Sequence, residues 1–272
     1  MYIPAYKIRK FRSEIRKYYR KNKRDFLWRR TQNPYHILVS EIMLQQTQTE
    51  RVVPKYRAFL KQFPNFQALA QAPLADVLAV WQGLGYNRRA LALKNLSKIV
   101  VTKFKGRLPR DPKLLIEFPG IGEATAGAVV AFAFNKPALF IETNIRRVFI
   151  HFFFSRSKAV RDEQILEVVL RTMDRVRPRE WYWALMDYGA MLGALPKNPN
   201  QKSAHYRTQS PFVGSHRQLR GKVLTVLLAA GSLNRRALYR AVRANSGRVR
   251  EVLTELVREG FIMQRKSRLV IV

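Results

Sequence analysis

The chain contains no cysteine among its 272 residues. Disulfides, thiolate metal sites and cysteine-ligated iron–sulfur clusters are therefore excluded for this sequence. It also lacks any run of about 18 apolar residues that could span a membrane. Residues 1–22 are basic and amphipathic, without the apolar segment of a secretory signal. We therefore expect a soluble protein of the cytoplasm that does not use a membrane as partner.

Acidic residues are scarce. Asp and Glu number 18 against 51 Lys and Arg, so the net charge is +33, and the excess runs along the whole sequence. Such a charge attracts polyanions, and the phosphate backbone of nucleic acid is the first candidate. Charge alone leaves open a ribosome-bound, membrane-surface or merely basic protein. The hydrophobic content of 47% is that of a globular chain, long enough for two or three domains.

Strand patterns are scarce as well. Up to residue 195 apolar residues recur almost everywhere at helical spacing, which predicts an all-α body. Residues 196–215 are rich in Pro, Asn, Ser and Lys and predict a linker. In residues 216–272 three short helical patterns precede a closing strand, which is typical of a winged-helix domain. A protein-contact domain of the same shape is the alternative.

Residues 114–148 predict a helix, a tight turn, a second helix and then a carboxylate at Glu142. Pro119 ends the first helix, and Gly120 and Gly122 permit positive φ angles or a close backbone approach. The N–H groups at the start of the second helix can bind one phosphate. An ordinary hairpin between two helices is the bland alternative.

Glu41 lies among apolar residues in a helix predicted from residue 35 to 45. Burial of a carboxylate costs several kcal/mol unless it is paired or protonated. The residue is either an acid with a raised pKa or a surface acid on the helix's one wet stripe.

Five segments carry a resemblance, namely residues 27–29, 40–48, 83–86, 119–122 and 143–148. In this order they resemble the helix-hairpin-helix DNA glycosylases, and most closely the MutY-type adenine glycosylases, over residues 20–192. The run Ser-Glu-x-Met-Leu-Gln-Gln-Thr-Gln selects the adenine branch. The resemblance implies a six-helix lobe at about residues 33–135 and a second lobe from 1–32 plus 136–195. The linker 196–215 then replaces a cluster loop, and 216–272 forms the winged-helix-like domain.

The same resemblance implies a mechanism in which a flipped-out purine is released by two acids. Glu41 protonates the purine, Glu142 stabilises the oxocarbenium character of the sugar, and Asn144 positions that anion and the water. It implies contacts to the target base from Arg29, Asp187, Gln45 and Gln46. It further implies DNA contacts from Gln48, Gly85, Tyr86, Arg88, Gly120, Ile121, Gly122, Thr125 and Arg146. A K or Na ion is expected at the backbone of Phe118 and Ile121.

The sequence departs from the resembling family at four places. Glu142 stands where the family has aspartate, and Ala124 stands where the endonuclease III branch has its lyase lysine, so we expect a monofunctional enzyme. Gly193 takes the place of the first cluster cysteine, so no iron–sulfur cluster and no other cofactor is expected. The winged helix replaces the domain that checks an opposite 8-oxoguanine. In the resembling family the cluster supports a basic loop that contacts DNA. The residues expected to replace that loop are Lys197, Lys202, His205 and Arg207.

The expected partner is double-stranded DNA with a mispaired or damaged base, bound by a monomer associated with the nucleoid. Three alternatives stay open. One is a glycosylase of the same fold for mismatched thymine or uracil, or for an alkylated purine. The others are a non-catalytic protein that binds damaged DNA and a structural basic protein without DNA selectivity.

Overall fold

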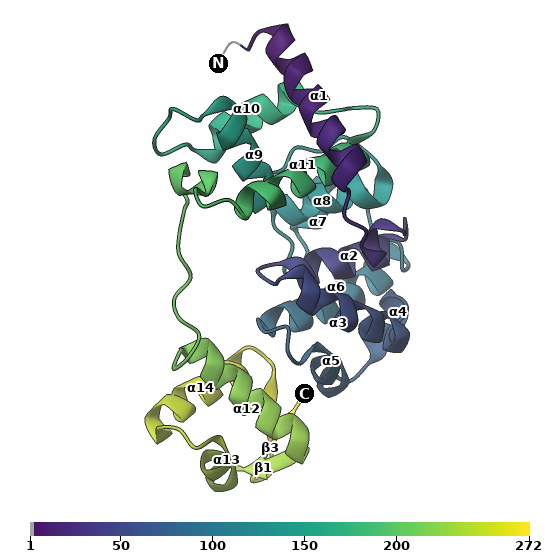
Figure 1. Ribbon diagram of the computed structural model, residues 1–272. Helices are drawn as coiled ribbons and strands as arrows, with labels where there is room; N and C mark the ends of the chain where they lie inside the picture. The colour runs from purple at the N-terminus through teal and green to yellow at the C-terminus, as the bar shows by residue number, and fades with distance from the viewer. Residues whose placement is uncertain (1–2) are drawn as a thin grey trace. The chain divides into compact units, whose positions relative to one another are not determined.

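The computed structural model describes residues 3–272, and helices make up most of it (Figure 1). The chain divides into two compact units. Unit 1 comprises the residues up to Glu41 together with Pro109–Glu117 and Ile121–Thr208, and unit 2 comprises Ile42–Leu108, Phe118–Gly120 and Gln209–Val272. The helical body is confirmed, whereas the boundaries predicted for the lobes, the linker and the C-terminal domain stay predictions.

Unit 1 is built from helices that pack around aromatic side chains. In α1, Phe11 and Ile15 are buried, and the Phe11 ring lies 5.0–5.7 Å from the rings of Phe149, Phe152, Phe153 and Trp181. The elements of unit 1 are α1 (Ala5–Asn22), η1 (Leu27–Arg29), most of α2 (Pro34–Leu44), α7 (Pro112–Ile116), α8 (Glu123–Phe134), α9 (Thr143–Phe153), α10 (Asp162–Thr172), α11 (Pro178–Gly193) and η2 (Pro199–Lys202).

The hairpin between α7 and α8 forms where the sequence predicted it. Gly120 has a φ of +81°, which a glycine adopts without strain. Gly122 has a φ of −98° and is the residue before α8, so the positive φ expected there is wrong. Within α8 a side chain on Gly127 would collide with Phe140, which explains the glycine at this position.

Unit 2 contains four further helices that follow the predicted pattern closely. They are α3 (Thr49–Gln62), α4 (Phe66–Gln71), α5 (Leu74–Trp81) and α6 (Arg88–Phe104). Phe59 and Trp81 are fully buried and their rings lie 5.8 Å apart. The end of α2, from Ile42 onward, belongs to unit 2, so these residues make most of their contacts within unit 2.

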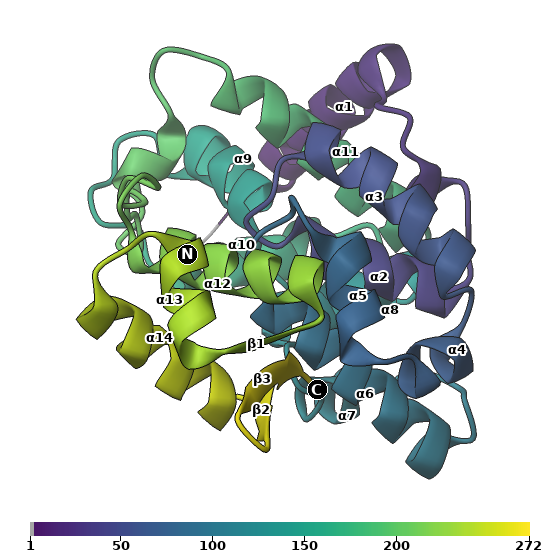
Figure 2. The same cartoon turned by 90° about the horizontal axis from the view of Figure 1, so that it is seen from below.

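The C-terminal part of unit 2 is a small domain of three helices and a three-stranded antiparallel sheet (Figure 2). Each helix starts at a capping side chain, which is Ser215, Asn234 or Asn245. The sequence predicted the last strand but missed β1, which is only three residues long. The elements are α12 (His216–Ala230), β1 (Ser232–Asn234), α13 (Arg235–Val242), α14 (Ser246–Arg258), β2 (Ile262–Arg265) and β3 (Arg268–Ile271), in the sheet order β1-β3-β2. The assignment as a winged helix stays a prediction.

Candidate active site

Glu41 lies one turn before the end of α2, next to the buried Ser40 and Ile42. The residue as a whole is partly exposed, but no hydrogen bond or ion pair to its carboxyl group occurs within residues 3–272. Burial, and next the charge of Glu142, raise the pKa of Glu41 to about 8, against an opposing effect of Arg29. A pKa of about 8 favours the protonated form of Glu41 at neutral pH. The catalytic role predicted for Glu41 stays a prediction.

Glu142 is the residue before α9, and its carboxylate caps the N-terminus of that helix. One oxygen accepts the N–H of Ile145 at 2.7 Å, and the other accepts the side-chain amide of Asn144 at 3.1 Å. Burial raises the pKa of Glu142, while these two donors and the charge of Arg147 lower it. An anion at a helix N-terminus is also favoured by the helix dipole. The net pKa of Glu142 is raised, because burial is the largest influence, but its two hydrogen-bond donors favour the ionised form, and Glu41 has no such donor within residues 3–272.

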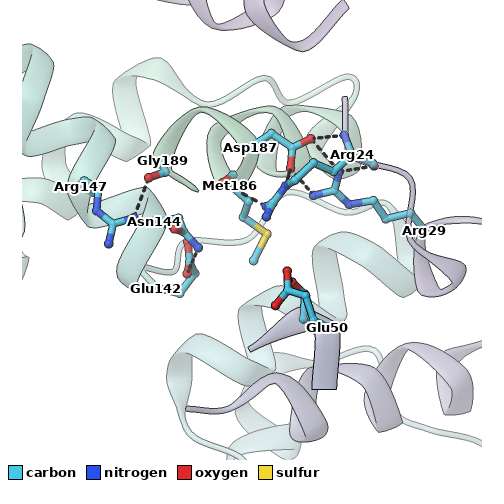
Figure 3. Close-up of polar contacts among 10 residues, drawn as sticks. Arg24, Arg29, Glu50, Glu142, Asn144, Arg147, Met186, Asp187 and Gly189 are labelled. Atoms are coloured by element: carbon cyan, nitrogen blue, oxygen red, sulfur yellow. Dashed lines mark hydrogen bonds and ion pairs between the residues drawn. The ribbon is translucent and has the colours of Figure 1, made fainter. Parts of the chain in front are cut away.

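Asn144 is held in one orientation by Arg147 (Figure 3). The Arg147 guanidinium donates to the side-chain oxygen of Asn144 at 2.9 Å and to the carbonyl of Gly189 at 2.6 Å. With its oxygen occupied, Asn144 presents its NH₂ to Glu142. The order Arg147, Asn144, Glu142 fixes the anion without placing a cation directly on it.

Two glycines of α11 make room for this arrangement. A Cβ on Gly189 would collide with the backbone carbonyl of Asn144, and a Cβ on Gly193 would collide with the Arg147 guanidinium. Their absence of side chains lets α9 and α11 approach closely. In the sequence Gly193 was noted only because it stands where the resembling family has a cysteine, and Arg147 was not predicted as a site residue.

Asp187 forms a second polar centre in unit 1 (Figure 3). Its side chain is 1% exposed and accepts the Arg24 N–H at 3.0 Å, the Arg24 Nε at 2.6 Å and both terminal nitrogens of Arg29 at 2.8 Å. Burial raises the pKa of Asp187, but Arg29 and Arg24 outweigh it and hold the value below normal. A carboxylate has about four lone-pair sites, and four donors occupy them. The base contact predicted for Asp187 stays a prediction, and the contacts present are those that position two arginines.

Arg29 connects the two centres electrostatically, because its charge also acts on Glu41. Its side chain is 7% exposed, and its guanidinium lies 5.3 and 5.5 Å from the ring centres of Phe26 and Trp183. Unit 1 by itself therefore brings together Glu41, Glu142, Asn144 and Arg29 of the predicted site.

The other predicted residues of unit 1 have mixed surroundings. Gly122 is exposed, Thr125 is half-buried and Ile121 is buried. Arg146 makes a two-pronged ion pair with Asp162 at 2.8 and 2.6 Å, so its guanidinium already has a partner. The DNA contacts predicted for these residues stay predictions.

The remaining predicted DNA contacts lie in unit 2. Gln45 donates to the carbonyl of Gly120 at 3.2 Å, Gln48 is exposed just before α3, and Gln46 has a positive φ of 54°. Gly85 and Tyr86 also have positive φ angles, 73° and 47°. Arg88 is paired with Glu259 at 2.6 Å, and the Tyr86 hydroxyl accepts from Gln209.

Arg89 organises this region, and the sequence analysis missed it. Its buried guanidinium donates to the carbonyls of Ile42, Met43, Gln45, Leu84 and Gly85 and to the Thr47 hydroxyl. Burial lowers its pKa to about 10, and no carboxylate of residues 3–272 pairs with it. One side chain thus ties the end of α2 to the loop before α6. Its neighbour Arg88 gave the same pattern in the sequence, so nothing distinguished the two.

The residues of the linker that was predicted to replace a cluster loop do not fit an iron–sulfur cluster. The chain offers no thiolate, and Arg147 fills the space beside Gly193. Polar contacts hold the loop instead. Asn198 accepts the Arg147 Nε at 3.1 Å, and Asn200 donates to the Thr143 carbonyl at 3.0 Å. Lys202, which was expected to contact DNA, donates to the Ser155 carbonyl.

Within residues 3–272 no three His, Cys, Asp or Glu side chains are grouped so that they could hold a metal ion. The ion expected at the backbone of Phe118 and Ile121 stays a prediction.

Within residues 3–272 no helix is both long and apolar enough to cross a lipid bilayer.

Comparisons with known proteins agree with this fold. A solved structure of a thermostable thymine-DNA glycosylase is similar with a TM-score of 0.63 and 28% identity, over 72% of this chain and 92% of that one. The adenine DNA glycosylase of Mycolicibacterium smegmatis is 34% identical over 232 residues, 79% of each chain. The adenine DNA glycosylase of Buchnera aphidicola subsp. Baizongia pistaciae is 38% identical over 63% of this chain. The match covers 49% of that relative, so this chain spans about half of the relative's length.

The helical body and its hairpin are thus those of a DNA-repair protein with a helix-hairpin-helix fold. Residues 39–171 match the HhH-GPD superfamily of base excision DNA repair proteins. The chain belongs to that superfamily.

Proposed function

We propose that this protein is a DNA glycosylase that hydrolyses the N-glycosidic bond of adenine mispaired with guanine or 8-oxoguanine in double-stranded DNA. The observation that carries the proposal is the pair of acids in unequal surroundings. Glu41 has no donor within residues 3–272 and a pKa of about 8, whereas Glu142 accepts two hydrogen bonds. Two carboxyls of which one holds a proton and one stays ionised are what acid-assisted glycoside cleavage requires.

In the proposed reaction the adenine nucleotide leaves the base stack, since its glycosidic bond is inaccessible within the duplex. Glu41 donates its proton to a ring nitrogen of the purine. The bond between C1′ and the base then breaks, and its electron pair leaves with adenine. The Glu142 carboxylate stabilises the positive charge on the sugar, positioned by Asn144. Water adds to C1′ and releases a proton to solvent, and Glu41 takes up a proton from solvent, so that the products are an abasic site, free adenine and the starting enzyme.

The enzyme is proposed to be monofunctional. A lyase step needs an amine that forms a Schiff base with C1′. Ala124, in the first turn of α8, has no amine to offer. Water is then the nucleophile, and the DNA strand stays intact until alkali or another enzyme cleaves the abasic site. No cofactor takes part, and the protein acts as a monomer on duplex DNA.

The choice of adenine has two supports. One is the run at residues 40–48, which resembles the adenine branch, and the other is the identity of 34–38% to two adenine DNA glycosylases. A second candidate substrate is mismatched thymine or uracil. It is favoured by the similarity to a thymine-DNA glycosylase structure at 28% identity.

The deciding experiment is single-turnover cleavage with excess protein of duplexes that carry one altered pair. The panel contains A opposite G, A opposite 8-oxoguanine, A opposite T, and T or U opposite G, with alkali revealing abasic sites. We expect release of adenine from the first two duplexes only. Release of thymine or uracil alone would replace adenine as the substrate. Tight binding without any abasic product would leave a non-catalytic DNA-binding protein.

Substitutions of Glu142 separate its charge from its capping role in the same assay. Glu142→Gln keeps an oxygen for the Ile145 N–H but loses the anion, and we expect a rate loss on the order of a hundredfold. Glu142→Asp keeps the anion and a good helix cap, so its rate should stay within about tenfold of the wild type. Equal losses in both variants would show that reach, and not charge, limits the reaction.

A further inference from the structure

The first helix, α1, carries a concentration of positive charge that the proposed reaction does not use. Its 18 residues hold eight Lys and Arg and one acid, Glu14, so they contribute +7 of the chain's +33. This is far more than their share of 272 residues. Glu14 is itself engaged, because it accepts the hydroxyl of Tyr188 at 2.8 Å.

The cations of α1 form two parallel rows on its outer face. At 3.6 residues per turn, Arg9, Arg12, Arg16 and Arg20 line up along one side of the helix. Lys10, Lys17 and Lys21 form the neighbouring row. From Arg9 to Arg20 the first row is about 16 Å long at about 1.5 Å per residue. Along the duplex axis each strand has one phosphate about every 3.4 Å, so a length of axis equal to this row carries about five phosphates of each strand.

The arginine row borders a shallow hollow of about 320 Å³, lined by Arg9, Arg12, Ser13, Arg16 and Arg20. Two of these arginines are anchored. Arg12 donates to the carbonyls of Thr172 and Met173 at 2.9 and 2.8 Å, and Arg16 pairs with Asp174 at 2.6 Å. They give the hollow a fixed wall.

Five cations of this face have no hydrogen bond or ion pair within residues 3–272 and are exposed, namely Arg9, Lys10, Lys17, Arg20 and Lys21. Acids are few nearby. Asp174 is paired with Arg16, and Glu180 lies 3.8 Å from Arg177. A ligand with several negative charges would therefore meet these five cations without displacing another partner.

The opposite face of α1 is buried in unit 1, against α10 and α11 (Figure 1). An amphipathic helix that binds membranes inserts its apolar face into the lipid. Here Phe11 and Ile15 are 2% and 0% exposed and are not available for that purpose. The free face is cationic, with Tyr6 as its one large exposed aromatic side chain. A polyanion fits it better than a lipid surface.

We propose that this face of α1 is a second DNA-binding surface, which holds the phosphate backbone of duplex outside the damaged pair. The inference takes its ligand, double-stranded DNA, from the proposed function, but it does not depend on which base is released. Phosphate contacts from these cations add non-specific affinity that falls steeply with salt. They hold the protein on undamaged DNA while the target pair is sought.

The test compares two variants of the full chain that lose the same charge. The α1 variant is Arg9→Gln/Lys10→Gln/Lys17→Gln/Arg20→Gln. The control variant is Arg57→Gln/Lys61→Gln/Lys98→Gln/Lys103→Gln, exposed residues of α3 and α6 whose side chains make no hydrogen bond or ion pair within residues 3–272. Binding to an undamaged duplex of about 40 base pairs is measured by fluorescence anisotropy over a range of salt concentrations, where each phosphate contact contributes about 0.9 to the slope. Thermal unfolding confirms that both variants fold.

We expect the slope of log affinity against log salt to fall by about 2–4 in the α1 variant and by less than about 1 in the control. The rate of base release at saturating protein should be unchanged in both. Equal slopes in the two variants would overturn the proposal, because general charge would then explain binding. Loss of binding to vesicles containing phosphatidylglycerol, with an unchanged DNA slope, would also overturn it in favour of a membrane surface. If the wild type releases no base but the slopes differ, the proposed function fails and the second surface stands.

Discussion

Two acids of unit 1, Asp187 and Glu41, have pKa values that are shifted in opposite directions. Asp187 is surrounded by donors from Arg24 and Arg29, which hold its pKa below the ordinary value. Glu41 has no hydrogen-bond donor within residues 3–272, and its pKa rises to about 8. Burial alone raises both values, so the difference comes from the donors and the charges around each group.

Glu142 lies between these extremes. It accepts two hydrogen bonds, yet the nearest arginine of its network, Arg147, reaches it through Asn144. The comparison teaches that burial raises the pKa of all three acids and that the surrounding groups decide the outcome. Asp187, held by donors from two arginines, ends with a lowered pKa, whereas Glu142 and Glu41 end with raised ones.

The largest effect is expected from Glu41→Gln, which removes the transferable proton. General acid catalysis is worth about 10²–10⁴-fold, so we expect the single-turnover rate of adenine release to fall about a thousandfold. Since the protonated form is the active one, the wild-type rate should fall as pH rises through about 8. Glu142 must be ionised, so the rate should also fall on the acid side, at a pH above the ordinary glutamate value of 4.5.

The residual rate of Glu41→Gln should not fall as pH rises through about 8. This comparison tests directly whether Glu41 is the group that titrates there. Stability gives an independent check. A raised folded-state pKa means that the folded protein keeps a proton which the unfolded chain releases above pH 4.5. Glu41 then lowers the free energy of unfolding increasingly between pH 4.5 and 8. Glu41→Gln should therefore be more stable than the wild type at pH 8 and similar at pH 4. Equal stability at both pH values would contradict the raised pKa.

The next effect concerns Asp187→Asn, which leaves two arginines without their counter-charge. Breaking a buried ion pair costs about 3–5 kcal/mol, and Arg24 is partly exposed, so we expect a loss of about 3 kcal/mol in the free energy of unfolding at pH 7. Denaturant unfolding measures it. The depressed pKa of Asp187 provides its stability above pH 3.8, and the difference from the wild type should shrink as pH falls below that value. A stable variant with normal unfolding but no activity would instead favour the base contact.

The sequence predicted the helical body and the hairpin, and it showed Glu41 among apolar neighbours, because these features depend on local patterns. Apolar spacing sets the helices, and Pro119 and Gly120 set the turn. Glu41 was recognisable since its neighbours in the chain are also its neighbours in space. The strand β1 was missed because three residues carry too little alternation to be seen.

The arrangement around Asp187, and the part that Arg147 plays beside Asn144 and Glu142, could not be read from the chain. The partners of Asp187 lie 163 and 158 positions away, at Arg24 and Arg29, and nothing local marks them among 51 Lys and Arg. For the same reason Arg89 was passed over in favour of Arg88. Long-range polar contacts depend on packing that the sequence pattern does not specify.

The smallest effect tests whether Arg147 positions Glu142 through Asn144. Arg147→Met removes the donors to Asn144 and Gly189, so the Asn144 amide is free to turn and present its oxygen to Glu142. The anion would then be held by the Ile145 N–H alone, and we expect the single-turnover rate at saturating protein to fall about tenfold, since small misplacements at a reacting centre reduce rate by up to about a hundredfold. Arg147→Lys keeps a donor and should recover most of the rate. Because Arg147 opposes the raised pKa of Glu142, the acid fall of the Arg147→Met profile should also move to higher pH, which a merely structural role would not produce. A loss of stability with an unmoved acid fall would place Arg147 with Asp187, as a group that holds α9 and α11 together and leaves the anion unaffected.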